Sequence, residues 1–164
     1  MRSRHLSLLL LALVVVASVP SLEARLGEKL SDLRQRFGKP QGQPAKDMQV
    51  WLIEEAAGPL LYTVTFGADG RSVAEGLKPY RQARLTEQSA RAFIADQFTV
   101  LADPTKVRVI KSGEAYRFAG QDFTCGEGEQ AFLDEQGGVL IVWTPRDPAS
   151  VMAVTAEFVQ RKTP

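Results

Sequence analysis

A helical pattern and a helix stop meet in RLGEKLSDLRQRFGKP, residues 25–40 of the 164-residue chain. Its apolar residues recur at spacings that place them on one face of a helix. They are Leu26, Leu30, Leu33 and Phe37. Gly38 can adopt a positive φ after a helix without a steric penalty, and Pro40 cannot continue a helix. The stretch therefore predicts an amphipathic helix that ends at Phe37, followed by a loop over residues 41–47.

The Gly-Lys-Pro element at positions 38–40 allows two interpretations. We interpret it as a structural stop, because glycine and proline commonly terminate helices at these positions. The alternative is a functional role, in which the loop over residues 39–47 presents an edge to a binding partner.

Strands are expected downstream of this loop. Residues 48–55 are rich in β-branched and aromatic side chains, and residues 60–67 alternate with the period of two that is typical of a half-buried strand. Asp69-Gly70 is a strong hairpin signal and leads into a weaker third strand over residues 72–80, which Pro79 ends. Together these segments predict a three-stranded meander.

A second helix is predicted over residues 85–98. Thr86 is a suitable N-cap, and Glu87 lies favourably in the first turn. The segments after it read as two short strands, a glycine-rich loop and a hairpin that turns at Gly137-Gly138. Their ranges are 106–111, 114–120, 121–129, 130–134 and 139–143.

The last segment, residues 151–162, fits either a strand or a helix. We favour a strand because several of its residues are β-branched. The fold class is therefore α+β, with two short helices packed on an antiparallel sheet. The order of elements suggests a loose αβββ pattern used twice, although the residues themselves do not repeat.

Four segments of the chain resemble a set of uncharacterised exported bacterial proteins with an LGE…(F/Y)GKP element. The segments are LGE (26–28), RFGKP (36–40), FGADGR (66–71) and LTEQSARAFI (85–94). More distantly, a helix that ends in Gly-x-Pro and leads into a meander is similar to SmpA/OmlA-type outer-membrane assembly lipoproteins and to β-lactamase-inhibitor-protein-like folds. The resemblance implies an exported α+β domain and no catalytic residue.

Residues 1–24 have the layout of a secretory signal peptide. Arg2 and Arg4 precede an apolar run over residues 6–19 that is shorter than a membrane-spanning helix, and Ala24 is a suitable cleavage position. Cleavage after Ala17, or an uncleaved anchor, are the alternatives. No cysteine lies near the cleavage region, so a lipoprotein signal is excluded. We expect export to the periplasm or the extracellular space, which leaves a single domain over residues 25–164.

Composition excludes several classes of function. The chain has 20 basic and 19 acidic residues and no run of Lys and Arg, so we expect no nucleic-acid partner. Its one histidine, His5, lies in the signal segment, which excludes Ser–His–Asp and Cys–His catalysis and zinc sites with imidazole ligands. Its one cysteine, Cys125, has no internal disulfide partner and is interpreted as a small buried side chain rather than a nucleophile.

An acidic loop around Cys125 is the one cluster of side chains that could bind a metal ion or act in catalysis. Asp122, Glu127 and Glu129 lie among glycines, where carboxylates could bind Ca²⁺ or act as a glycosidase acid and base. Their spacing matches no known loop signature, so we interpret the loop as solvated. We predict no catalytic residue, no metal and no cofactor.

Aromatic residues on the strands could form a ligand surface, although core packing explains most of them. They are Trp51, Tyr62, Tyr80, Tyr116 and Trp143. The sequence thus predicts an exported, non-catalytic binding or structural module of the bacterial cell envelope, whose partner is a protein or an envelope component. A carboxylate-dependent, glycosidase-like hydrolase is the alternative. Contact with the membrane is expected only if residues 1–24 are retained.

Overall fold

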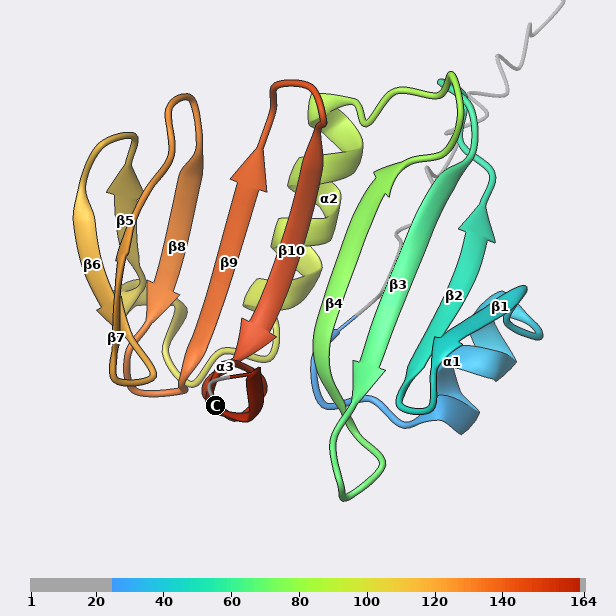
Figure 1. Ribbon diagram of the computed structural model, residues 1–164, viewed down its shortest axis with the longest axis horizontal. Helices are drawn as coiled ribbons and strands as arrows, with labels where there is room; N and C mark the ends of the chain where they lie inside the picture. The colour runs from blue at the N-terminus through green and yellow to red at the C-terminus, as the bar shows by residue number, and fades with distance from the viewer. Residues whose placement is uncertain (1–24, 163–164) are drawn as a thin grey trace, which may run out of the picture.

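The computed structural model describes residues 25–162, which form an α+β fold with three helices and a mostly antiparallel sheet (Figure 1). The predicted signal peptide lies outside the described residues. Among the residues that are described, no helix is long and apolar enough to cross a membrane. The elements in chain order are α1 (Leu30–Phe37), β1 (Gly42–Ala45), β2 (Met48–Ile53), β3 (Leu60–Phe66), β4 (Ser72–Pro79), α2 (Glu87–Phe98), the 3₁₀ turn η1 (Pro104–Lys106), β5 (Arg108–Lys111), β6 (Ala115–Phe118), β7 (Gln121–Thr124), β8 (Gln130–Asp134), β9 (Val139–Thr144), β10 (Ser150–Thr155) and α3 (Ala156–Lys162).

Helix α1 is shorter than the apolar spacing predicts, because it begins at Leu30. Gly27 has a φ of 88°, so the chain turns before the helix starts. Leu26 nevertheless packs in the same core as Leu33, from the turn rather than from the helix. Two charge-assisted hydrogen bonds of 2.8 Å, donated by Arg36 to Glu28, hold this turn against the helix.

The predicted helix stop at Gly38 is confirmed. Its φ is 75°, and its N–H donates to the carbonyl oxygen of Arg34 at 2.9 Å. Its ψ of −159° lies outside the left-handed helical region, so the chain leaves the helix in an extended conformation that only glycine adopts readily. The carbonyl oxygen of Gly38 accepts a hydrogen bond of 3.0 Å from Nε1 of Trp51, which ties the loop to β2.

The predicted meander is confirmed as β2, β3 and β4, which pair antiparallel in sequence order. The prediction of a plain loop over residues 41–47 was wrong, because β1 forms there and pairs with β2. This strand is short, and its sequence, GQPA, has no apolar alternation. Pairing with β2 therefore determines its conformation more than its own residues do.

Helix α2 starts as predicted, with the side chain of Thr86 accepting a hydrogen bond from the N–H of Ser89. The hairpin of β8 and β9 is also confirmed. The predicted loop over residues 121–129 was wrong in its first part, because β7 pairs there with β6. The prediction for residues 151–162 was half right, since β10 continues to Thr155 and α3 follows it.

Within residues 25–162, eight strands form one sheet in the order β1-β2-β3-β4-β10-β9-β8-β5. The sheet has two halves, β1-β2-β3-β4 and β5-β8-β9-β10, and in each the strands follow one another from the edge to the centre. The last strands of the two halves, β4 and β10, pair at the centre. Helices α1 and α2 pack on one face, over a core that includes Leu33, Trp51 and Phe93. A second apolar cluster forms on the opposite face, beneath the β6–β7 hairpin and α3.

Candidate functional site

The face of the sheet opposite α1 and α2 is largely apolar. Directly paired residues on neighbouring strands point to the same face, so the strand register gives its rows. One row is Met48, Thr65, Ala74, Val154, Leu140, Leu133 and Arg108, and the next is Val50, Thr63, Gly76, Met152, Val142, Ala131 and Ile110.

Half of this face is covered by the chain itself. The β6–β7 hairpin lies over the β5, β8 and β9 side, at the left of Figure 1. Tyr116 and Phe118 of this hairpin are 9% and 4% exposed, and both pack against the buried residues of the strands beneath them. Helix α3 adds Phe158 and Val159 beside the hairpin. These contacts bury the half of the face over β5, β8 and β9, which forms a second core.

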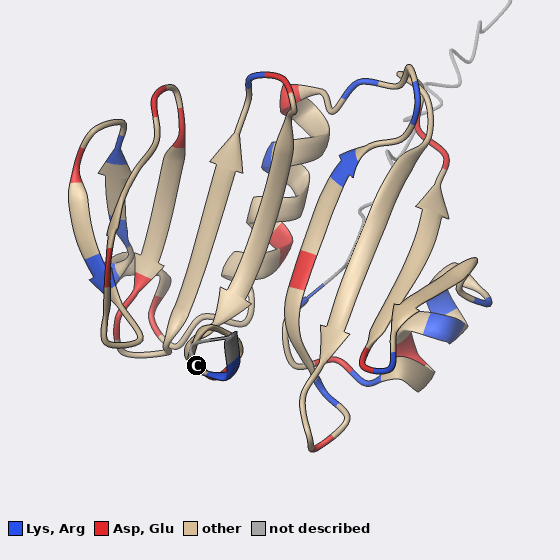
Figure 2. Cartoon of the chain, in the orientation of Figure 1, with Lys and Arg blue, Asp and Glu red and all other residues tan. Residues whose placement is uncertain are grey.

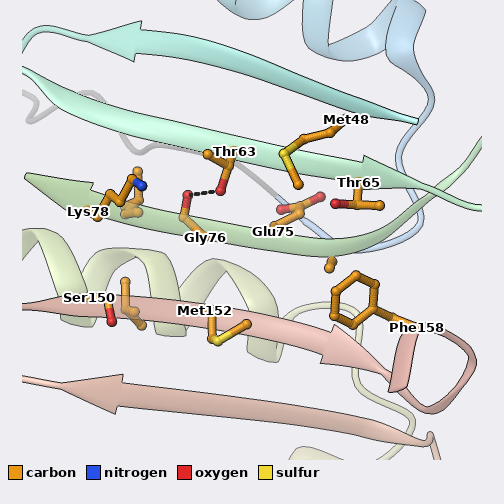
Figure 3. A pocket seen from close by; sticks show the side chains of 12 residues that line it. Met48, Thr63, Thr65, Glu75, Gly76, Lys78, Ser150, Met152 and Phe158 are labelled. Carbon is orange, nitrogen blue, oxygen red and sulfur yellow. Dashed lines mark hydrogen bonds between the residues drawn. The ribbon is translucent and has the colours of Figure 1, made fainter. Parts of the chain in front are cut away.

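The other half, over β2, β3, β4 and β10, is covered less: Phe158 of α3 reaches it and Thr65 and Ala74 are buried, but no hairpin lies over it. A hollow of about 220 Å³ lies there (Figure 3). Met48, Thr65 and Phe158 stand around the hollow. Gly76 provides no side chain to fill it, and the hydroxyl of Thr63 donates to the carbonyl oxygen of Gly76 at 3.4 Å. Met152 lies at its edge with 40% of its surface exposed.

A second hollow, of about 290 Å³, lies beside the first on the same half of the sheet. It is lined by Val50, Leu52 and Leu61, with Tyr80 at its edge. We call the face that carries both hollows the open face, defined by the outward residues of β2, β3, β4 and β10. They are Met48, Val50, Leu52, Leu61, Thr63, Thr65, Ala74, Gly76, Lys78, Ser150 and Met152.

Charge is almost absent from the open face. Figure 2 shows that β2, β3, β9 and β10 carry no charged residue, while charged residues lie in the helices, the turns and strands β4 to β8. Two charged residues line the first hollow: Lys78, near the end of β4, and the buried Glu75 in the middle of the same strand (Figure 3). Such a surface suits an apolar partner with a few polar atoms better than a highly charged one.

Glu75 lies in the middle of β4 and is the buried charge of the site region, at 2% exposed. Its carboxylate accepts hydrogen bonds from Oγ of Ser72 at 2.7 Å and from Nε2 of Gln97 at 3.0 Å. The oxygen of the Gln97 amide accepts from the N–H of Leu26 at 3.0 Å. Burial raises the pKa of Glu75 to about 7, against the hydrogen bonds from Ser72 and Gln97, which lower it.

This network is structural in character. It joins the segment before α1, the middle of β4 and the last turn of α2 through atoms that are fully or nearly buried. Sequence reasoning missed it. The available signal was the alternation of Val73, Glu75 and Leu77, which places a carboxylate on the core side of a strand.

The structure gives each of the predicted acidic candidates a different partner. Asp122 lies on β7, 3.8 Å from Arg117 across the hairpin, and Glu127 contacts Arg146 at 2.7 Å. Glu129 accepts hydrogen bonds from the N–H of Gly126 and the hydroxyl of Thr144, so it braces the turn. Among residues 25–162, no three His, Cys, Asp or Glu side chains gather as metal ligands.

Cys125 is 2% exposed and packs in the cluster under the β6–β7 hairpin, as the interpretation of a small buried side chain requires. Burial raises the pKa of its thiol, which lowers its reactivity. Among the predicted aromatic residues, Trp51, Tyr62 and Tyr116 are buried. The remaining two are half-buried on different surfaces: Tyr80 lies by the open face, and Trp143 lies under Arg91.

No protein-family model and no curated protein sequence matches this chain. Among solved structures it is similar to a cysteine-rich secretory protein from Staphylococcus aureus subsp. aureus Mu50, with a TM-score of 0.45 and 10% sequence identity. The match spans 82% of this chain and 46% of the other, so the chain corresponds to about half the length of that protein. A similarity this weak supports no conclusion about function.

Proposed function

We propose that the protein is an exported, non-catalytic binding module of the bacterial cell envelope and that it binds its partner on the open face. The observation that carries the proposal is the unequal cover of one continuous apolar face. The chain covers the half over β5, β8 and β9 with its own hairpin. It leaves the half over β2, β3, β4 and β10 with two hollows and an exposed Met152.

An internal repeat would explain this inequality, and we propose one. Each half consists of a helix followed by strands that run from an edge of the sheet to its centre: β1-β2-β3-β4 and β5-β8-β9-β10. The β6–β7 hairpin is inserted between the first two strands of the second half. At the matching place in the first half, Lys46 and Asp47 alone connect β1 to β2. The first half therefore lacks the insert that covers the second.

The covered half also indicates the chemistry of the partner. Its cover is an extended hairpin that contributes Tyr116 and Phe118 to an apolar floor. We therefore expect an extended segment with apolar side chains, supplied by a protein or an envelope component. We propose no cofactor and no nucleic-acid partner, because the open-face residues include a single cation, Lys78. Export rests on the signal-like layout of residues 1–24.

Site-specific photo-crosslinking in the producing cell tests the proposal. A photoreactive amino acid at position 61 or 152 of the full chain is expected to give one adduct of defined mass. Position 109 on the edge strand β5 is the matched control, because Val109 is 46% exposed and Met152 is 40% exposed. The adduct at position 61 should disappear with Met152→Lys and persist with Val109→Lys. Equal adducts at all three positions, or none at 61 and 152, would overturn the proposal.

A further inference from the structure

A polar pocket lies on the opposite face of the sheet from the open face, where the Gly-Lys-Pro element leaves α1. It has a volume of about 440 Å³, within the range of small-molecule sites. Its lining includes Arg34 of the last turn of α1, Lys39 of the loop, Gln43 of β1 and Gln49 of β2.

Gln49 is the unusual member of this pocket. It is 7% exposed, yet no residue within 25–162 forms a hydrogen bond with its side-chain amide. The oxygen and nitrogen of this amide are not among the buried polar atoms that lack a partner, so the amide group itself reaches solvent in the pocket. An unpaired amide that lines a pocket is therefore available for a ligand.

The two cations of the pocket are also available. Within the described residues, neither Arg34 nor Lys39 forms an ion pair or a side-chain hydrogen bond. No acidic residue lines the pocket. A guanidinium can donate two parallel hydrogen bonds to a carboxylate or phosphate, and an ammonium adds a mobile point charge.

The loop that carries these groups is held in place before any ligand binds. The carbonyl oxygen of Gly38 accepts from Trp51, and the N–H of Gln41 donates to the carbonyl oxygen of Val50 at 2.8 Å. The side-chain oxygen of Gln41 accepts from the N–H of Leu52, also at 2.8 Å. A ligand would therefore order few groups on binding, which favours affinity.

We propose that this pocket binds an oxyanion, the carboxylate or phosphate of a small ligand, through Arg34, Lys39 and the amide of Gln49. The site shares Gln41 and Gly42 with the second hollow, but its cations and Gln49 are not open-face residues, and it does not rest on the proposed function. It gives the Gly-Lys-Pro element a binding role in addition to its role as a helix stop.

Nuclear magnetic resonance titration of the protein, purified as the cell produces it, tests this site. Inorganic phosphate and citrate are the probes, and sodium chloride at equal ionic strength is the control. We expect saturable shifts of the Gln49 side-chain NH₂ and of the Lys39 and Gln43 backbone amides. Saturation with phosphate alone or with citrate alone would assign the oxyanion to one class. Shifts that do not saturate, or that chloride reproduces, would overturn the proposal.

Variants separate binding from folding. Arg34→Gln, Lys39→Gln and Gln49→Leu should each weaken binding roughly tenfold, the effect of losing a hydrogen bond to a charged group. Gln49→Leu should not lower the unfolding midpoint, because it removes an amide that has no partner. Lys111→Gln, on the far edge strand β5, makes the same change of charge and should leave binding unaltered. Equal effects of Lys111→Gln and Arg34→Gln would contradict a specific site.

Discussion

At the scale of single residues, Glu75 is a buried acid whose pKa burial raises to about 7. Desolvation disfavours its ionised form, and the hydrogen bonds from Ser72 and Gln97 recover only part of that cost. The carboxyl therefore titrates near neutral pH in the folded state. A residue that looks like an ordinary strand position in the sequence couples folding to pH.

The raised pKa of Glu75 determines whether the free energy of unfolding rises or falls with pH. Its folded pKa of about 7 exceeds its ordinary value of 4.5, so the folded state binds more protons between these two pH values. The free energy of unfolding should therefore fall as the pH rises from about 4.5 to about 7, by about 3 kcal/mol, and then level off. Urea denaturation of the wild type across this range measures the fall.

The isosteric variant Glu75→Gln isolates this contribution from all other titrating groups. Its amide oxygen can accept from Gln97 while its NH₂ donates to Oγ of Ser72, so the network can be kept. We expect the difference in stability between variant and wild type to grow in favour of the variant toward pH 8. A difference that is constant with pH would show that Glu75 is ionised throughout.

At the scale of elements, local sequence signals predicted the hairpin turns. They could not predict the short strands β1 and β7, which have few apolar residues. Asp69-Gly70 and Gly137-Gly138 have backbone requirements that their own residues meet, and both hairpins form. In contrast, β1 (GQPA) has no large apolar residue and β7 (QDFT) has only Phe123, and each strand forms because a neighbouring strand offers hydrogen bonds. Such pairing depends on distant parts of the chain.

The candidate sites could not be predicted from the sequence for a related reason. The open face is defined by the lack of a hairpin over it, and β10 joins it from a part of the chain that is distant in sequence from β2, β3 and β4. The oxyanion pocket joins Arg34 to Gln49 only after β1 and β2 pair. The sequence offered Gly38 and Pro40 as markers of the loop, and it could not indicate that an unpaired amide would lie beneath them.

Gly38 allows a test of the helix stop itself. Its φ and ψ lie in a region that other residues adopt at a cost of about 1–3 kcal/mol, and an added Cβ would meet no atom within 4 Å. Gly38→Ala should therefore lower the free energy of unfolding by that amount through the backbone alone. Gly42→Ala, at a glycine without positive φ, is the control and should change it by about 0.5 kcal/mol or less. Equal effects of the two substitutions in urea denaturation would contradict the stop.

For the molecule as a whole, one sheet serves two purposes. Its helix-covered face and the hairpin-covered half of the other face supply the apolar burial that stabilises the fold. The open face contributes residues such as Met152 that remain partly in water. We therefore expect folding to depend on the covered half and to tolerate changes on the open half.

A pair of truncations measures that division. Phe118, in the hairpin, is 4% exposed, so Phe118→Ala should lower the free energy of unfolding by about 3–5 kcal/mol, the usual range for an aromatic residue truncated in a core. Met152, on β10, is 40% exposed, so Met152→Ala should lower it by about 1 kcal/mol or less. Binding of a fluorescent hydrophobic dye to the folded protein should rise with Phe118→Ala, which loosens the cover, and fall with Met152→Ala, which removes apolar surface. If Met152→Ala were as destabilising as Phe118→Ala, the open face would belong to the folding core, and the proposal that it is kept free for a partner would fail.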